Sequence, residues 1–433
     1  MVPSVAPSGP GDQGPRPLCV VIVQRQLEDY SSGNASYLAI FLKAAKAAGY
    51  AIHIVFAPER SFSNRPWAGL NPRFEALADS VTWPRSLRIG QRFVSLSWRV
   101  YRRFAVRLVQ EALRRAGSTS RFAQVQSFLG SPLDPTEMRN VLKAMPPDTA
   151  RLVVAEYSSL APVLAEIPPG PAKAALLHDL FALRAESMRA IGRAPDHVDI
   201  TMEEEARRCA GADALFYASD TERAAFAAHL PGAQHIWMRP DVGRHTPTTP
   251  QGEARAVFLG TRHAGNFDAL AVLMEEIWPR VLDRRPGSVL WIAGSIGDGL
   301  PSAWAALPGV KTLGRVADLA TIGGRQSVGL APTRAASGVS IKVAEYMRLA
   351  MPVVAMPMAL EGFGDSLDDL AEIADTPTNF ADRVVALLND DAARAHRADR
   401  GFREIGARLS NAALERYLTK TRDPQPRLAT VNR

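Results

Sequence analysis

The chain has 433 residues, 47% of them hydrophobic and 22% charged, a composition that excludes a disordered protein and favours two folded domains. Its two cysteines, Cys19 and Cys209, stand far apart with no metal-ligand partner nearby, which excludes a disulfide framework and a structural zinc site. The net charge is +7, and a single segment, residues 85–121, carries ten arginines against one acid, so the rest of the chain is nearly neutral.

The first elements predict a parallel sheet. Residues 1–17 are rich in Pro and Gly, lack the apolar core of a signal peptide, and are expected to form a disordered leader. The apolar run at 18–23 is typical of a strand buried on both faces, and helical spacing over 36–48 precedes a second strand at 51–58. This order of elements is typical of a doubly wound α/β domain.

The next stretch is predicted to be mostly helical, with residues 85–121 forming a basic, amphipathic helical segment. One interpretation is a helix whose apolar side packs on the domain. Another is an interfacial helix that holds the protein to anionic lipids, with Arg92, Arg99, Arg102 and Arg103 as membrane contacts. RNA binding is a third, and no recognised motif supports it.

The remaining pattern predicts two Rossmann-like domains facing across a cleft, with ligands at the carboxyl ends of the strands. The expected N-terminal domain spans 18–240, a proline-containing linker spans 241–252, and the C-terminal domain spans 253–400. A C-terminal helix is expected at 401–420 and a mobile tail at 421–433. The further strands are predicted at 151–157, 174–179, 214–219, 256–260, 288–294, 310–314, 327–332 and 352–357, with helices at 267–282 and 340–349.

Several nucleotide-binding motifs are missing. No G-x-G-x-x-G follows the first strand, and the segment starting at Gly260 has Asn266 where a P-loop requires lysine. These departures argue against dehydrogenases and ATPases. There is also no H-E-x-x-H or D-x-D pair, so we expect no metal and no other cofactor, with lysine, arginine and backbone amides handling phosphate.

The most informative segment is APTRAASGVSIKVAEYMRLAMPVVAMPMALEG, residues 331–362. It resembles the donor-binding motif of retaining GT-B glycosyltransferases of the glycosyl transferases group 1 type. In that pattern a glycine-rich turn and a basic residue precede a glutamate and a small-Pro-Val-Val strand. The corresponding residues here are Gly338, Ser340, Lys342, Glu345 and the strand that begins at Pro352.

The physical chemistry of this segment agrees with the resemblance. Ser337 and Gly338 precede a helix whose free amides can bind diphosphate oxygens. Lys342 can neutralise phosphate, and Glu345, on the same helical face, can accept hydrogen bonds from ribose hydroxyls. The alternative is an ordinary ion pair between Lys342 and Glu345. Many relatives have a second glutamate where this chain has Ser337.

Residues 256–295 resemble the opening of the same C-terminal domain. The resemblance implies that Gly260, Thr261 and Arg262 form a loop under the distal phosphate, with Arg262 as a charged donor. Gly294, at the end of a later strand, is expected to form a turn near the nucleobase, and Asn266 to cap the helix that follows the loop.

In the N-terminal half, LLHDLFALR (176–184) ends a strand with His178 and Asp179, where relatives place a His or Asp. Asp179 is the candidate base for the acceptor hydroxyl, and His178 the candidate hydrogen-bonding partner of the donor sugar; a satisfied core histidine is the alternative. Glu156 is the reserve candidate for the base. Gly33 and Asn34 are candidates for a loop at the reaction centre.

These observations predict an enzyme that moves a sugar from a nucleotide diphosphate donor to a saccharide or lipid-linked acceptor, in exopolysaccharide or glycolipid assembly. Retention of anomeric configuration is implied by the resemblance. We expect a cytoplasmic protein, peripheral on the inner face of the membrane if the basic segment binds lipid, with no nucleic-acid partner. The alternatives are a nucleotide-sugar epimerase and a non-catalytic nucleotide-sugar-binding protein. The sequence does not identify the base, sugar or acceptor.

Overall fold

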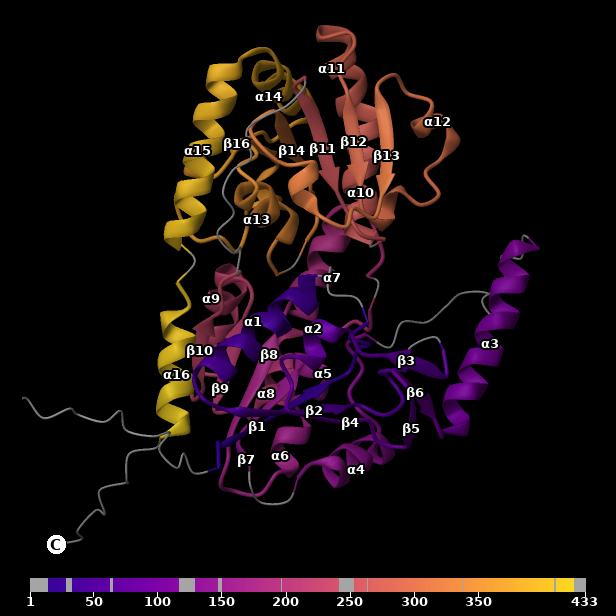
Figure 1. The fold of residues 1–433 in the computed structure, drawn as a ribbon, viewed down its shortest axis with the longest axis vertical. Coiled ribbons are helices and arrows are strands. Elements are labelled where there is room, and N and C mark those ends of the chain that lie inside the picture. Colours follow the sequence, from indigo (N-terminus) through magenta and orange to yellow (C-terminus); the bar gives the residue numbers. More distant parts are fainter. Residues whose placement is uncertain are drawn as a thin grey trace, which may run out of the picture.

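The computed structural model describes residues 15–28, 33–62, 65–116, 129–146, 150–195, 197–240, 253–262, 264–336, 338–408 and 410–423. Most of the predicted leader, the whole predicted linker, the end of the tail and Ser337 therefore lie outside the described residues. The described chain forms two α/β domains, one above the other in Figure 1. The two Rossmann-like domains predicted from the sequence are confirmed.

The N-terminal domain is built on a seven-stranded parallel sheet with the order β10-β9-β8-β7-β1-β2-β4. The interior strand β1, between β7 and β2, buries all but its first residue, as its unbroken apolar run predicts. The strands are β1 (Leu18–Val23), β2 (Ala51–Phe56), β4 (Ser80–Thr82), β7 (Ala150–Glu156), β8 (Ala172–Leu177), β9 (Ala214–Tyr217) and β10 (Gln234–Trp237). The helices are α1 (Gly33–Ala47), α2 (Pro72–Glu75), α4 (Pro135–Ala144), α5 (Tyr157–Leu160), α6 (Val163–Glu166), α7 (Phe181–Ala190), α8 (Met202–Cys209) and α9 (Asp220–Ala227).

The C-terminal domain has a six-stranded parallel sheet with the order β13-β12-β11-β14-β15-β16. Its strands are β11 (Arg255–Leu259), β12 (Leu290–Ala293), β13 (Val310–Gly314), β14 (Ser327–Ala331), β15 (Val353–Ala355) and β16 (Glu372–Ile373). Its helices are α10 (Ala264–Val272), the π-helical turn η2 (Leu273–Ile277), α11 (Trp278–Arg284), η3 (Ser295–Gly297), α12 (Ser302–Ala305), η4 (Leu319–Thr321), α13 (Ile341–Arg348), η5 (Pro357–Ala359), η6 (Leu367–Asp369), α14 (Pro377–Asn389) and α15 (Asp391–Arg408).

The helix predicted at 267–282 is interrupted by the π-helical turn η2. Pro279 stands in the first turn of α11 and has no backbone N–H to continue the helical hydrogen-bond ladder. The chain accommodates it by widening the preceding turn.

The last helix, α16 (Ala412–Arg422), returns to the N-terminal domain. Leu414 and Leu418 are fully buried in the core that also contains α1, and the Tyr50 hydroxyl donates to the Leu418 carbonyl at 3.1 Å. Asn411, before the helix, exchanges two hydrogen bonds with the backbone of Arg239. The C-terminal helix expected at 401–420 is thus two helices, α15 and α16, that run along both domains.

The expectation of mostly helical structure between β2 and β7 is wrong. A small antiparallel sheet, β3-β6-β5, lies there and consists of β3 (Trp67–Gly69), β5 (Ser86–Ile89) and β6 (Arg92–Ser95). Of the predicted basic helix, residues 85–116 are described, and of these Trp98–Arg115 form the helix α3. Gly90, with a positive φ of 59°, forms the tight turn between β5 and β6. The sequence did not predict this hairpin, because its arginines interrupt the alternation of apolar and polar residues that is typical of a strand.

Candidate active site

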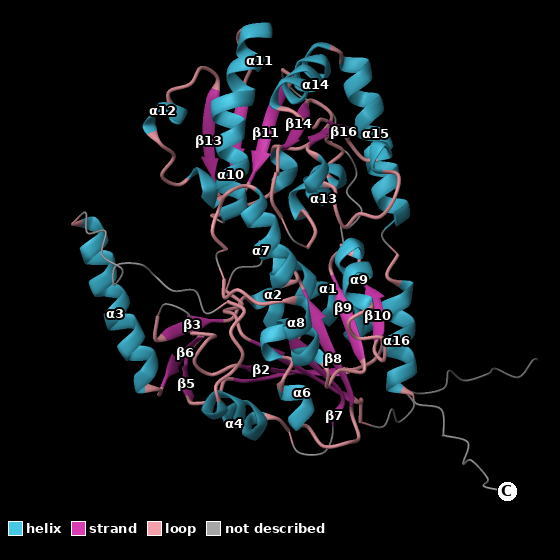
Figure 2. Ribbon diagram, turned by 180° about the vertical axis from the view of Figure 1, so that it is seen from behind, coloured by secondary structure: helices cyan, strands magenta, loops and turns pink. Residues whose placement is uncertain are grey.

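The donor motif predicted from the sequence lies at the start of α13, on the side of the C-terminal domain that faces the N-terminal domain (Figures 1 and 2). Ser340 occupies the N-cap position with no side-chain capping bond. Gly338 has a positive φ of 69°, which favours glycine there. Its N–H donates to Oε1 of Glu222 in α9 at 2.8 Å, so this amide already has a protein partner. Ser337 lies outside the described residues.

Lys342 has an unusual environment. Its Nζ donates to Oδ1 of Asn266 at 2.7 Å and lies 4.7 Å from the centroid of the Phe258 ring. Burial lowers the pKa of Lys342 to about 7. Glu345 pairs instead with Arg348, whose Nε donates to it at 2.9 Å. The alternative of an ordinary Lys342–Glu345 ion pair is therefore not what the structure shows.

The two predicted glycine turns of the C-terminal domain touch. A Cβ on Gly294, whose φ is 98°, would lie only 2.2 Å from the Gly260 carbonyl oxygen, so a side chain is excluded there. The Arg262 backbone N–H donates to Oγ of Ser295 at 3.2 Å, and the Arg262 guanidinium bonds the Asp298 carbonyl.

Asn266 connects this loop to Lys342. Its Nδ2 donates to the Thr261 carbonyl at 3.0 Å while its Oδ1 accepts from Lys342. The sequence predicted a helix cap, but α10 begins at Ala264 and Asn266 lies within its first turn. Asn266 orients the lysine. This role depends on the approach of α10 and α13, so the residues next to Asn266 in the sequence do not predict it.

The candidate catalytic residues follow the carboxyl ends of two neighbouring strands. His178 comes directly after β8, and its Nε2 lies 2.8 Å from Oε1 of Glu156, the last residue of β7. Asp179 accepts from Nη1 of Arg184 at 2.7 Å. All four side chains are buried. Glu156 therefore positions the His178 ring, and Arg184 neutralises Asp179.

The first helix adds a polar group next to this pair. Asn34, at the start of α1, donates to the hydroxyl of Tyr157, and Arg25 donates to the same hydroxyl at 3.3 Å. Burial raises the pKa of Tyr157. Arg25, which our sequence interpretation missed, is exposed and lies two residues beyond β1. Its position after a strand's carboxyl end was the available signal, because open α/β sheets bind ligands there.

Direct contacts join the two halves of the predicted site. A Cβ on Gly338 would lie 2.5 Å from the His178 carbonyl oxygen and 3.7 Å from Cβ of Asp179. A Cβ on Gly33 would lie 3.1 Å from Cγ1 of Ile341. The start of α13 thus abuts both the end of β8 and the start of α1. The four arginines predicted to contact a membrane lie elsewhere, on β6 and α3.

Besides the hydrogen bond between Gly338 and Glu222, an ion pair also crosses the domain boundary. Asp268 in α10, almost fully buried, accepts from Nε of Arg193, which follows α7, at 3.0 Å. Arg334, from the loop after β14, donates to both oxygens of the same carboxylate. These two arginines outweigh the effect of burial and hold the pKa of Asp268 below its usual range. Within the described ranges, no three His, Cys, Asp or Glu side chains are grouped as a metal site requires.

Residues 253–390 match the family model of the glycosyl transferases group 1. None of the curated proteins matches the chain. The match covers most of the C-terminal domain, including Gly260, Lys342 and Glu345. It supports a C-terminal domain of the glycosyltransferase type.

Solved structures resemble the whole described fold. Sucrose-phosphate synthase from Thermosynechococcus elongatus has a TM-score of 0.64 at 13% identity, over 93% of this chain and 98% of that one. The UDP-forming α,α-trehalose-phosphate synthase from Burkholderia vietnamiensis has a TM-score of 0.58 at 14% identity, over 95% and 98%. Anabaena Alr3699/HepE, solved with UDP and glucose, has a TM-score of 0.56 at 12% identity, over 94% and 99%. The match to TarM spans 54% of that chain. At these identities the likeness shows the fold, which is GT-B.

Proposed function

We propose that this protein transfers a sugar from a nucleotide diphosphate donor to a hydroxyl group of a saccharide or lipid-linked acceptor. The observation that carries the proposal is the close approach of Gly338, within the family match, to His178 and Asp179 of the other domain. A donor bound at α13 would thus have its sugar next to polar groups of the N-terminal domain.

In this proposal the diphosphate binds beside Lys342, Ser340 and the Gly260–Arg262 loop. Lys342 has a pKa of about 7 in the free protein. The negative charge of an arriving diphosphate would favour the charged form of Lys342, so the lysine would take up a proton when the diphosphate binds. The ammonium then stabilises the negative charge that develops as the diphosphate leaves. Lys342, Arg262 and the helix amides would make a metal ion dispensable. Glu345 would hydrogen-bond the ribose.

Across the boundary, His178 would hydrogen-bond the donor sugar while Glu156 holds its ring from the other side. Asp179 would accept the proton of the acceptor hydroxyl, with Glu156 as the reserve base. Retention of the anomeric configuration is part of the proposal, because the donor motif resembles retaining enzymes. The anomer of the product, determined by NMR, tests it.

The pathway and the location belong to the same proposal. Exopolysaccharide or glycolipid assembly would supply the acceptor. Cys19 and Cys209 are buried free thiols, which suits the reducing cytoplasm.

A thermal-shift panel tests donor binding directly. Nucleoside diphosphates and their sugars are added in the presence of EDTA, and a ligand at a hundred times its Kd should add about 2.7 kcal/mol to stability. We expect a shift with UDP or GDP compounds that Lys342→Met abolishes and Lys311→Met, an exposed lysine in β13, retains. The absence of a shift with every nucleotide would contradict the proposal. Turnover of donor to an isomer without acceptor would instead indicate an epimerase, and binding without turnover a non-catalytic protein.

A further inference from the structure

Helix α3 stands away from the two-domain body in both ribbon views (Figures 1 and 2). Val100 packs in the core of the N-terminal domain, but most of the other large apolar side chains of α3 are exposed and not packed on the domain, as one interpretation of the sequence expected. Trp98 is 62% exposed, Leu108 55% and Val109 51%. Removing such side chains from water is favourable, and helices normally turn them inward. The exposed apolar face of α3 therefore requires an occupant.

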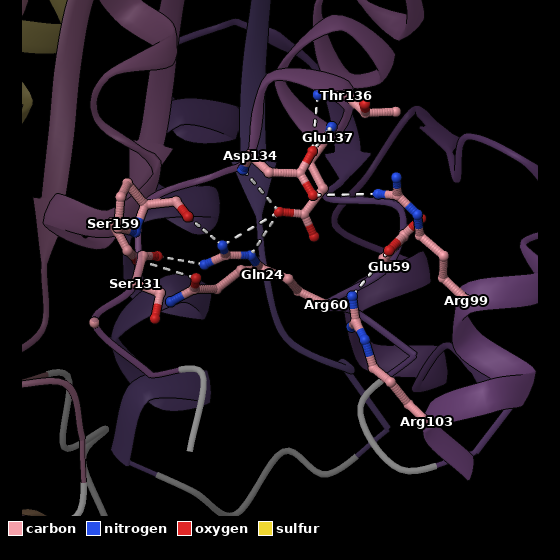
Figure 3. Close-up of polar contacts among 12 residues, drawn as sticks. Gln24, Glu59, Arg60, Arg99, Arg103, Ser131, Asp134, Thr136, Glu137 and Ser159 are labelled. Carbon is pink, nitrogen blue, oxygen red and sulfur yellow. Dashed lines mark hydrogen bonds and ion pairs between the residues drawn. The ribbon is translucent and has the colours of Figure 1, made fainter. Parts of the chain in front are cut away.

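The opposite face of the helix attaches it to the body. Glu59, almost fully buried, accepts from the Ser97 hydroxyl and from Nη2 of Arg103, both at 2.9 Å. Arg99 lies 3.4 Å from Asp134, the N-cap of α4 (Figure 3). Arg99 and Arg103, predicted from the sequence to contact lipid, thus fix the helix in place and direct its apolar face outward.

The exposed apolar side chains form one surface. Trp98, Tyr101 and Leu108 recur at helical spacing on one side of α3. Phe104 on the same helix makes an edge contact with Trp67 of β3, with 5.7 Å between ring centroids. Through this contact the helix meets the small sheet, whose β5 exposes Leu87 and Ile89. We name β3, β5, β6 and α3 together the basic lobe.

The charge of the basic lobe indicates its occupant. Helix α3 contains six arginines and one acid, Glu111. Pairing with a second copy would bring two such cationic helices together, which is unfavourable. An anionic lipid surface complements the charge, and it accepts Trp and Tyr rings at the level of the headgroups. Arg102 lies 5.5 Å from the centroid of the Trp98 ring, so its charge borders the apolar stripe. No helix in the described ranges is long and apolar enough to span a bilayer.

We propose that the basic lobe docks on an anionic lipid surface, with the apolar face of α3 and the tip of the β5–β6 hairpin entering the headgroup region. Arg102, beside Trp98 on the exposed side of α3, and Arg92, exposed on β6 next to the hairpin tip, extend to the lipid phosphates. The proposal does not depend on the donor site and stands whether or not the protein transfers a sugar.

Vesicle flotation tests this surface with the full-length chain. The vesicles contain phosphatidylcholine alone or mixed with phosphatidylglycerol. The apolar stripe is changed in the double variant Leu108→Gln/Val109→Gln, and the charge in Arg92→Gln/Arg102→Gln. The control is Val198→Gln, an exposed apolar residue outside the lobe. Unchanged melting temperatures and far-UV circular dichroism spectra show that each variant is folded.

We expect the wild type and Val198→Gln to float only with the phosphatidylglycerol vesicles, less so at high salt. The stripe variant should lose about tenfold or more in partitioning, because two exposed apolar side chains no longer enter the lipid. The charge variant should lose its preference for anionic lipid. Equal flotation of the stripe variant and the wild type would overturn the proposal. So would a concentration-dependent dimer, seen by sedimentation without lipid, that the stripe variant abolishes, because a second copy would then be the occupant.

Discussion

Replacing Lys342 with Met should stabilise the free protein while abolishing nucleotide binding. The side chain is part-buried, and among the described residues its hydrogen-bond partner is the neutral amide of Asn266. The drop of its pKa from the ordinary 10.5 to about 7 would correspond to roughly 5 kcal/mol at ~1.36 kcal/mol per pH unit, if the group were fully shielded from water. Because water reaches the side chain, we expect a gain of about 2 kcal/mol at pH 7.

The dependence of this gain on pH identifies its origin. Between about pH 7 and 10.5 the unfolded chain holds a proton that the folded protein has released, so wild-type stability rises with pH across this window. Below pH 7 both states hold the proton and the full destabilisation remains. The advantage of Lys342→Met should therefore be largest at and below pH 7 and shrink towards pH 9.

Melting temperatures provide the assay. For a domain of 150–250 residues, ~1 kcal/mol shifts Tm by about 2–4 °C, so we expect Lys342→Met to melt about 4–8 °C above wild type at pH 7. Lys311→Met, in the same domain but exposed, should melt like wild type. A Lys342→Met variant that melts at or below the wild-type temperature, or that nucleotides still stabilise, would refute this reasoning.

Three further predictions concern the domain boundary. Gly338→Ala should lower nucleotide affinity at least about tenfold, because its Cβ would collide with the His178 carbonyl. Gly287→Ala, also at positive φ but in open space, should change the affinity by no more than about twofold. Equal effects of the two variants in a binding titration would contradict the clash argument. Asp179→Asn should lower kcat about 100-fold or more. Glu156→Gln should lower kcat much less, because glutamine keeps a hydrogen-bond acceptor for His178. A larger loss in Glu156→Gln than in Asp179→Asn would make Glu156 the base. Arg193→Ala should increase the radius of gyration in small-angle scattering, because it releases Asp268 from the N-terminal domain. Arg189→Ala should leave the radius unchanged, because Arg189 and its partner Asp199 both lie in the N-terminal domain. An unchanged radius in Arg193→Ala would show that other contacts hold the domains together.

Strands buried on both faces could be predicted from the sequence because an apolar run signals them without help from the rest of the chain. The predicted strand at 18–23 has the same bounds as β1. The strand predicted at 174–179 is β8, which ends at Leu177. His178 and Asp179 therefore lie just beyond the strand, where Glu156 and Arg184 position their side chains. The family-like segment likewise located Gly338 and Lys342.

The contacts that complete the site could not be predicted, because they join residues distant in sequence. Glu222 is a surface-like residue in the sequence of α9, yet it is buried and accepts the Gly338 and Leu180 amides. Burial raises its pKa well above the ordinary range. The sequence around Asn266 predicts a helix cap, whereas in the fold α13 places Lys342 within hydrogen-bond distance of Asn266. For α3 the sequence left several interpretations open for a related reason: an amphipathic pattern predicts a face to bury but not what buries it.

The most direct test of the central claim is sugar transfer itself. The protein is incubated with nucleotide-sugar donors and a panel of saccharide and lipid-linked acceptors, with EDTA present, and release of nucleoside diphosphate is followed together with the glycosylated product. We predict acceptor-dependent release that Lys342→Met abolishes and Lys311→Met retains. Release that is absent with every donor and acceptor, or that is equal in Lys342→Met and wild type, would contradict the proposed glycosyltransferase site.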